Sequence, residues 1–146
     1  VFACKLWWWL RANDSIWAKF MHQKYVRGVH PSKAAVRRPP LSWRRLVAIR
    51  EMAERQIRWC LGRGFVDFWH DKWLGEETVA EMVGVHDPPH MLAAEFVVQN
   101  EWNVSKLLQW LPMRVVSRIQ DTQTFSHLED MMVWGCLPSR GSLQSN

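Results

Sequence analysis

The sequence predicts a mainly helical α+β fold with one small β-hairpin over about residues 57–69. Two short aromatic-rich runs flank Gly62-Arg63-Gly64, as strands flank a turn. Apolar residues recur at helical spacing in three stretches, 2–27, 42–56 and 104–120. The chain of 146 residues is 48% hydrophobic, which is enough for a buried core. It starts at Val1 rather than Met, so we expect residues 1–146 to be a single partial domain of a longer protein.

The first 27 residues predict a helical pair. Residues 2–12, FACKLWWWLRA, are apolar nearly all round, which is typical of a helix that is buried or awaits a partner. Ser15 is the expected N-cap of a second helix, which should end by Gly28. The three Trp at 7–9 also fit an anchor at a membrane interface, but Trp in a short amphipathic helix usually packs in a core.

Residues 28–41 predict a basic linker, because a glycine and three prolines interrupt any regular element. The charges of this linker are Lys33, Arg37 and Arg38. The prolines that follow Arg38 favour an extended, solvated arm. Such an arm either lies along a phosphate backbone or tethers the flanking helices, and the sequence leaves both interpretations open.

Residues 42–74 predict a helix followed by the hairpin. Ser42 is the expected cap of a helix to about Gln56. Arg44 and Arg45 lie in the first turn of this helix, where no acidic residue is near in sequence. Two cations at this end oppose the helix dipole, which suggests that an external anion binds there.

The predicted hairpin joins strands at 57–61 and 65–69 through a tight Gly62-Arg63 turn. This turn places Arg58 opposite Asp67 as a cross-strand ion pair. A three-residue turn would mix apolar and charged side chains on each face, so we favour the shorter one. We expect the tryptophans of this region to pack in the core rather than stack on bases: Trp59, Trp69 and Trp73.

Residues 75–137 predict an acidic helical part. Asn103 is the expected cap of a helix over 104–111, and Pro112 is expected to begin another. A polar tail is expected over 138–146.

The charge of the chain is divided unevenly. Residues 1–63 contain 14 Lys and Arg against 3 Asp and Glu, whereas residues 64–146 contain 5 against 11. A basic half with interleaved aromatics suits a polyanion such as RNA or DNA, although a solvated basic surface that balances the acidic half explains it as well. The candidate nucleic-acid contacts are Lys33, Arg37, Arg38, Arg44, Arg45 and Arg63.

We expect no catalytic site, metal site, cofactor or small-molecule substrate. His86 and His90 have the helical spacing of zinc ligands, but Pro88 and Pro89 prevent a regular helix between them. Asp67, His70 and Asp71 could suggest acid–base chemistry; a carboxylate that caps a turn is the simpler interpretation. Three scattered cysteines do not form a disulfide scaffold, which favours a reducing compartment, the nucleus or cytoplasm. No apolar run approaches the ~20 residues of a membrane span.

Several motifs resemble plant LINE-type (non-LTR) retrotransposon polyproteins. The most specific is Phe68-Trp69-His70-Asp71-Lys72-Trp73-Leu74. The others, within about residues 3–137, include Lys5-Leu6-Trp7-Trp8, Trp43-Arg44, Arg58-Trp59, Gly62-Arg63-Gly64 and Trp102-Asn103. Asp130–Trp134 resembles the family's strand that leads into its zinc-binding region, so the resemblance implies a strand there. In that family this segment follows the reverse transcriptase domain and precedes the zinc-binding and RNase H regions. One residue fewer than in the family separates Gly64 from the Phe68-Trp69 block, and the match is lost after Pro138.

The resemblance implies a non-catalytic connector fragment of a polyprotein that carries out RNA-directed DNA synthesis. It implies weak, non-specific contacts with RNA or DNA, and adjacent polyprotein domains as partners. The paired catalytic aspartates and the zinc cluster of that family would lie outside this chain. A different class of function is a protein-interaction module that docks through its Trp-rich helices.

Overall fold

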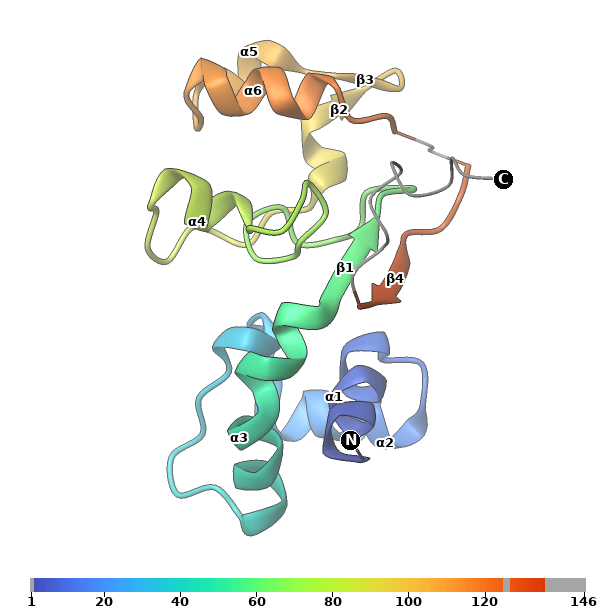
Figure 1. The fold of residues 1–146 in the computed structure, drawn as a ribbon, viewed down its shortest axis with the longest axis vertical. Helices are drawn as coiled ribbons and strands as arrows, with labels where there is room; N and C mark the ends of the chain where they lie inside the picture. The colour runs from blue at the N-terminus through green and yellow to red at the C-terminus, as the bar shows by residue number, and fades with distance from the viewer. Residues whose placement is uncertain (1, 125–126, 136–146) are drawn as a thin grey trace, which may run out of the picture.

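The computed structural model of the chain describes residues 2–124 and 127–135 and confirms a mainly helical α+β fold (Figure 1). Two lobes lie one above the other, and a small sheet lies between them. The N-terminal lobe comprises α1 (Phe2–Ala12), α2 (Ile16–Met21), a π-helical extension (His22–Val26), a 3-10 turn (Pro31–Lys33) and α3 (Leu41–Gln56). The sheet pairs β1 (Ile57–Cys60) with β4 (Met131–Trp134). The C-terminal lobe comprises α4 (Val79–Val83), a 3-10 turn (Ala93–Phe96), β2 (Val97–Val98), β3 (Glu101–Trp102), α5 (Val104–Leu108) and α6 (Met113–Gln120).

The N-terminal lobe is built on the packing of α1 against α3. Ser15 caps α2 as predicted, since its hydroxyl accepts a hydrogen bond from the Ala18 N–H at 3.1 Å. The core of this lobe includes the fully buried Trp7 and Trp43, and the ring of Trp43 stacks on Tyr25 with centroids 4.9 Å apart. The helical pair predicted for residues 1–27 is therefore present, and one of the three consecutive tryptophans is a core residue.

The linker predicted for residues 28–41 is folded in its first half. His30, Pro31 and Ala34 are buried, and the Arg50 guanidinium donates to the Ala34 carbonyl at 2.7 Å. These contacts hold the segment against α3, because a buried carbonyl needs a donor. Only the part just before α3 remains an exposed arm.

Ser42 is not the cap of α3. The helix begins one residue earlier, at Leu41, and its N-cap is Pro40, which has no side chain that could accept a hydrogen bond. The predicted end at Gln56 is confirmed. The start of α3 therefore exposes N–H groups that no side chain caps.

The predicted hairpin over residues 57–69 is wrong. β1 pairs antiparallel with β4, with Ile57 opposite Trp134 and Cys60 opposite Met131. Residues 65–69 form no strand, and Asp67 makes only an isolated bridge with Leu92. Arg58 consequently lies opposite Val133 instead of Asp67, and its guanidinium donates to main-chain carbonyls.

The Gly62-Arg63-Gly64 segment holds a carboxylate instead of turning a hairpin. Asp130 Oδ1 accepts from the N–H groups of Gly62 (2.6 Å) and Gly64 (2.9 Å), and Oδ2 accepts from that of Phe65 (2.6 Å). Gly64 has φ +83°, and a Cβ on Gly62 would collide with the main chain at Leu128, so both glycines are required. This contact brings the residues before β4 to the end of β1.

The short hairpin of the fold lies further along the chain, between β2 and β3. Its two turn residues, Gln99 and Asn100, have φ +51° and +63°. Two successive residues with positive φ are typical of a tight type I′ turn, which usually contains Asn-Gly or Asp-Gly. The sequence did not indicate it, because Gln is uncommon at this position.

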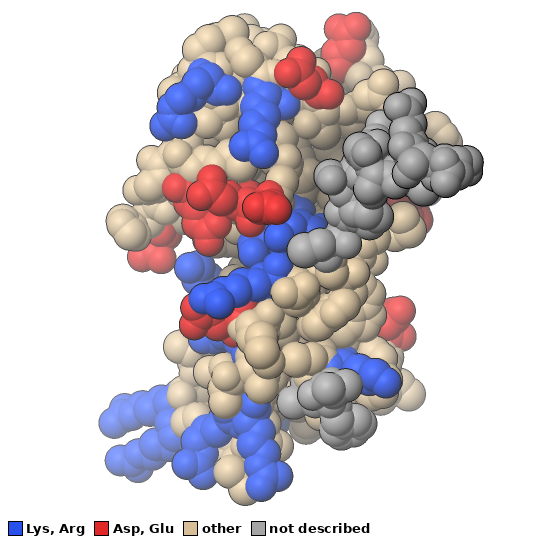
Figure 2. Space-filling model, viewed as in Figure 1, with Lys and Arg blue, Asp and Glu red and all other residues tan. Residues whose placement is uncertain are grey.

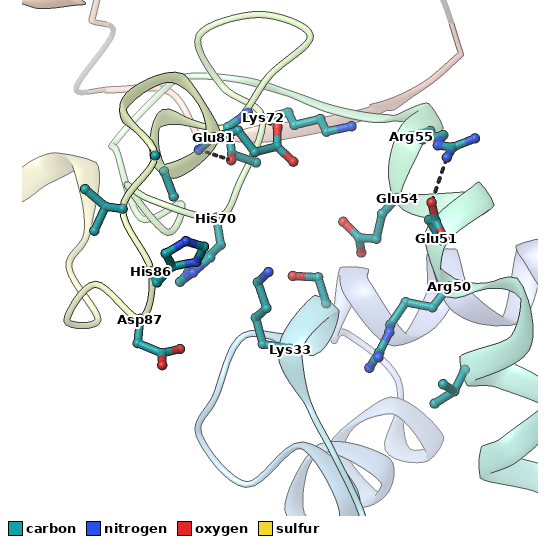
Figure 3. Close-up of a pocket in the computed structure, with 16 residues that line it drawn as sticks. Lys33, Arg50, Glu51, Glu54, Arg55, His70, Lys72, Glu81, His86 and Asp87 are labelled. Carbon is teal, nitrogen blue, oxygen red and sulfur yellow. Dashed lines mark hydrogen bonds and ion pairs between the residues drawn. The ribbon is translucent and has the colours of Figure 1, made fainter.

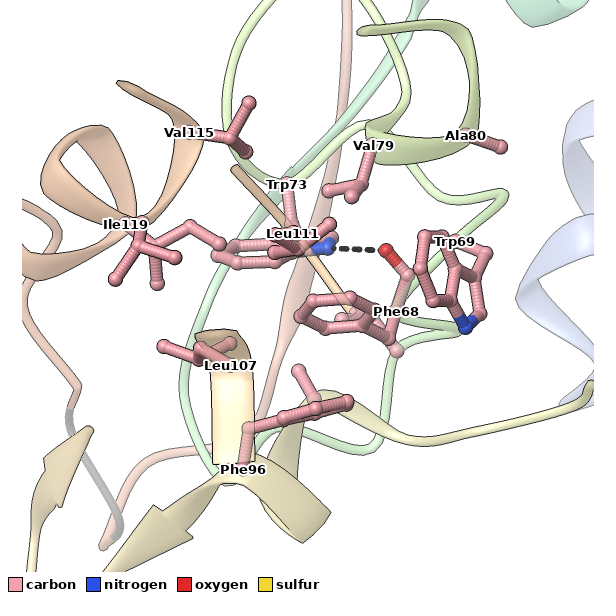
Figure 4. Packing of buried hydrophobic residues seen from close by; sticks show 13 residues of the cluster. Phe68, Trp69, Trp73, Val79, Ala80, Phe96, Leu107, Leu111, Val115 and Ile119 are labelled. Carbon is pink, nitrogen blue, oxygen red and sulfur yellow. Dashed lines mark hydrogen bonds between the residues drawn. The ribbon is translucent and has the colours of Figure 1, made fainter. Parts of the chain in front are cut away.

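The C-terminal lobe packs short helices around an aromatic core (Figure 4). Phe68 is fully buried and stacks on Phe96 at 4.1 Å, and the Trp73 indole N–H donates to the Phe68 carbonyl at 2.9 Å. Trp69 and Trp73 are core residues, as predicted. Trp59 is half-buried and packs against the cores of both lobes.

The remaining elements of this lobe follow the predictions in part. Asn103 caps α5 as expected, Pro112 is the N-cap of α6 instead of its first residue, and β4 is the strand predicted before the tail. The polar tail of 138–146 lies outside the described residues. In the part of the chain that the structure covers, no helix has the length and apolarity needed to cross a membrane.

Candidate nucleic-acid interface

Four of the six predicted contact residues gather where α3 begins. Arg37 and Arg38 lie on the exposed arm that runs beside α3, and Arg44 and Arg45 lie on the first turn of the helix. All four are exposed. Figure 2 shows Lys and Arg side chains concentrated at this end of the molecule. We call Arg37, Arg38, Arg44 and Arg45 the basic end.

Among the described residues, no acidic side chain neutralises the basic end. Within residues 2–124 and 127–135, none of its four guanidinium groups forms an ion pair or a hydrogen bond. Arg55, on the last turn of α3, behaves differently and pairs with Glu51 at 2.6 Å. The positive charge of the basic end is therefore available to an external anion.

The backbone adds to the positive potential at this end. The first helical hydrogen bond runs from the Arg44 N–H to the Pro40 carbonyl at 3.1 Å, so the N–H groups of the preceding turn have no acceptor within the helix. Unpaired N–H groups and the helix dipole both favour a negative group at a helix N-terminus.

The structure separates Lys33 and Arg63 from this group. Lys33 ends the 3-10 turn and borders the cleft between the lobes. Arg63 lies beyond β1, past the full length of α3, which is roughly 24 Å for 16 residues. Its Nε also pairs with Glu129 Oε1 at 3.2 Å, which reduces its availability to a ligand.

The cleft between the lobes has a volume of about 880 Å³ (Figure 3). Its basic lining residues are Lys33, Arg50, Arg55 and Lys72. Its acidic lining residues are Glu51, Glu54, Glu81 and Asp87. Burial and the nearby charge of Arg58 lower the pKa of Lys72. Because the two signs balance, the cleft has no preference for a polyanion, in contrast to the basic end.

A buried ionic network joins the lobes behind this cleft. Arg11 of α1 donates to Glu54 Oε1 at 2.7 Å and to Asp71 Oδ1 at 2.5 Å. The Trp7 indole N–H donates to the same Glu54 oxygen at 2.8 Å. Burial by itself would lower the pKa of Arg11, but the charges of Asp71 and Glu54 outweigh it and raise that pKa. The network therefore fixes α1 to the Phe68–Leu74 block of the other lobe.

Asp71 is the carboxylate on which this network converges. Its Oδ1 also accepts from His30 Nε2 at 2.7 Å, and its Oδ2 accepts from the Asp67 N–H at 2.7 Å. His30 Nδ1 accepts from the Ser32 N–H, which places the ring proton on Nε2. Burial alone would raise the pKa of Asp71, but Arg11 and the hydrogen bond from His30 hold it well below its ordinary value.

Asp67 stabilises the turn that presents Asp71. Its Oδ1 accepts from the N–H groups of Trp69 (3.0 Å) and His70 (2.9 Å), and its Oδ2 lies 3.1 Å from His90 Nδ1. Burial would raise the pKa of Asp67, but the hydrogen bonds from His70 lower it. Both carboxylates are thus occupied by structural hydrogen bonds. Among the residues described, no three His, Cys, Asp or Glu side chains form a group suited to a metal ion.

Sequence reasoning missed the junction between the lobes. Arg11 offers a signal in retrospect, since a lone cation at the end of an apolar helix needs a buried counter-charge. Asp71 within an aromatic block offers the matching signal. No comparable sequence signal indicates the contact between Asp130 and the Gly62-Arg63-Gly64 segment, because 66 residues separate Asp130 from Gly64.

No protein-family model, curated protein or solved structure matches this chain.

Proposed function

We propose that this chain is a non-catalytic connector that binds the phosphate backbone of RNA or DNA weakly and without sequence preference. The basic end provides the contacts. The observation that supports this most directly is a group of four exposed arginines, around an uncapped helix start, that have no acidic partner in the part of the chain that the structure describes.

The chemistry of these groups favours phosphate. A guanidinium presents a planar set of donors that matches two phosphate oxygens, and backbone N–H groups at a helix start add further donors. Phosphate contacts supply affinity but carry no sequence information. Four contacts predict a salt slope between roughly −2.8 for single strands and −3.6 for duplex DNA.

The wider setting that we propose is a retrotransposon polyprotein. The support is the resemblance of the Phe68–Leu74 block, which in this structure forms the junction between the lobes. In this proposal the chain holds neighbouring polyprotein domains together, while the basic end contacts template or primer during RNA-directed DNA synthesis.

Filter binding of a labelled single-stranded RNA, titrated at low and moderate salt, tests the proposal. Replacing the basic end with glutamine (R37Q/R38Q/R44Q/R45Q) should abolish most binding and flatten the salt dependence. A matched control removes four exposed arginines on other surfaces (R27Q/R55Q/R114Q/R118Q) and changes the net charge equally. Equal losses in both variants would show that binding follows overall charge, and an absence of binding at low salt would refute the proposal.

A protein-interaction module is the second candidate, and exposed apolar side chains on α1 and α2 favour it. Trp9 is 47% exposed, Phe20 53% and Ile16 90%. Exposed aromatics of this kind are enriched in protein interfaces. Binding that persists at high salt and is lost in Trp9→Ser, with the basic end intact, would favour this function instead.

A further inference from the structure

The β1–β4 sheet is open on one side. The Gly135 N–H donates to the Gln56 carbonyl at 2.9 Å, so these two residues form a hydrogen-bonded pair just beyond the ladder. Hydrogen-bonded and non-hydrogen-bonded pairs alternate along antiparallel strands. The Ile57–Trp134 and Trp59–Met132 pairs are therefore non-hydrogen-bonded. It follows that the N–H and C=O groups of Met132 and Trp134 point away from β1.

These outward groups have no partner in residues 2–124 and 127–135. The other side of the sheet differs, because the Trp59 N–H donates to the Lys72 carbonyl at 2.9 Å. Figure 1 shows β4 on the outer side of β1. Among the described residues, β4 is thus an edge strand with two donors and two acceptors that have no partner.

The sequence of β4 does nothing to prevent further pairing. Natural edge strands are usually protected by a charge, a proline or a bulge, whereas Met131–Trp134 contains none of these. Met131 is 58% exposed and Trp134 46% exposed. An apolar hollow of about 470 Å³ borders the strand, lined by Cys4, Trp8, Met52 and Trp134 among others.

We propose that β4 pairs antiparallel with β4 of a second copy of this chain, which makes a four-stranded sheet across a two-fold axis. A second copy fits because the free groups are self-complementary. Met132 placed opposite Trp134 of the second copy, and Trp134 opposite Met132 of the second copy, satisfies all eight groups in four hydrogen bonds. This register places Val133 opposite its own counterpart as a non-hydrogen-bonded pair.

The pairing should be reversible. β4 has only four residues, shorter than the mean strand, and the flanking Glu129 and Asp130 are engaged by Arg63 and the glycine segment. Association through one short edge belongs to the weak, transient class of interfaces. The oligomeric state should therefore depend on protein concentration.

Sedimentation equilibrium of the full chain over a range of concentrations tests the association. The mass should rise from 17.3 kDa towards twice that value. Met132→Pro should remain monomeric, because it removes an outward N–H that the β1 ladder does not use; Met132→Leu, which keeps that N–H, should associate like the wild type. A chain that stays monomeric at every concentration overturns the proposal.

Cysteine cross-linking tests the register independently of the proline variant. In a background with Cys4, Cys60 and Cys136 replaced by Ser, Val133→Cys should form a disulfide-linked dimer on mild oxidation, since its Cα atoms would lie about 4.5 Å apart. Met131→Cys is the matched control: its two copies are offset by four residues, roughly 13 Å, and should not cross-link. Equal cross-linking of both variants would refute the proposed pairing.

Discussion

The two lobes differ in how they use charge. In the N-terminal lobe, the arginines near the boundary with the other lobe make structural contacts. Arg11 pairs with Glu54 and Asp71, and Arg50 donates hydrogen bonds to carbonyl oxygens of the linker. The arginines at the start of α3 make no such contact with any described residue. In the C-terminal lobe, Asp67 and Asp71 are buried and Asp130 is held by the glycine segment. Charged groups near the boundary thus help to hold the fold together, whereas those at the basic end have no counter-charge among the described residues and are available to an external anion.

The largest expected effect is on stability and comes from removing a buried ring from the core of either lobe. Phe68→Ala in the C-terminal lobe and Trp43→Ala in the N-terminal lobe each remove a fully buried ring and should lower the free energy of unfolding by ~3–5 kcal/mol. The lobes share the β1–β4 sheet and the Arg11–Asp71 pair, so each variant should still unfold in one transition. Urea titration followed by circular dichroism and tryptophan fluorescence measures this. Two separate transitions would mean that the lobes are independent.

Breaking the junction should cost somewhat less. Asp71→Asn keeps the shape of the side chain but leaves buried Arg11 with Glu54 as its remaining carboxylate, so we expect a loss of about 3 kcal/mol in urea titration. Asp87→Asn at the exposed margin of the cleft is the control and should change stability by less than about 0.5 kcal/mol. Equal effects would show that the network does not hold the lobes together.

Acid should weaken the same junction. The pKa values of Asp67 and Asp71 are lower in the folded protein than in the unfolded chain. The stability that they contribute is complete above the unfolded value of about 3.9 and is lost as the pH falls from there through the folded values. Thermal melts from pH 6 to pH 2 should show this decline, and it should be shallower in Asp71→Asn. An identical slope in the variant would assign the acid sensitivity to other carboxylates.

Local sequence patterns predicted the helices but not the long-range contacts. Ser15, Asn103 and the end of α3 were predictable because caps and apolar spacing act within a few residues. The partner of β1 was not, since the backbone freedom of two glycines around Arg63 fits both a hairpin turn and a carboxylate-binding loop. The presence of Asp130 decides between them, and no local pattern links it to the glycines.

The candidate site was predictable to a similar extent. Excess charge and the lack of nearby acids indicated Arg37, Arg38, Arg44 and Arg45 from the sequence alone. The same reasoning included Arg63, because Glu129 is remote in sequence and becomes its neighbour only when β4 pairs with β1. The tertiary fold therefore separates two of the six predicted contact residues from the basic end and adds no residue to it.

The smallest expected effects are changes in the free energy of unfolding that have opposite signs at the two ends of α3. Arg44 and Arg45 oppose the helix dipole, and no described side chain gives them a counter-charge. The double variant R44Q/R45Q should therefore raise the free energy of unfolding by roughly 0.3–1 kcal/mol. Arg55 pairs with Glu51, which lies one turn earlier in α3, and it is near the C-terminal end, where the helix dipole favours a positive charge. Arg55→Gln should therefore lower the free energy of unfolding by about 0.2–0.5 kcal/mol.

Thermal melts at low salt measure both changes, and added salt should reduce both, because exposed charges are screened. R44Q/R45Q should at the same time weaken RNA binding. A variant that is more stable but binds RNA less well is the result expected when charge is retained for a ligand at a cost to the fold. If R44Q/R45Q were instead destabilising, the two arginines would be contributing to the fold, and the distinction between boundary charge and end charge would be wrong.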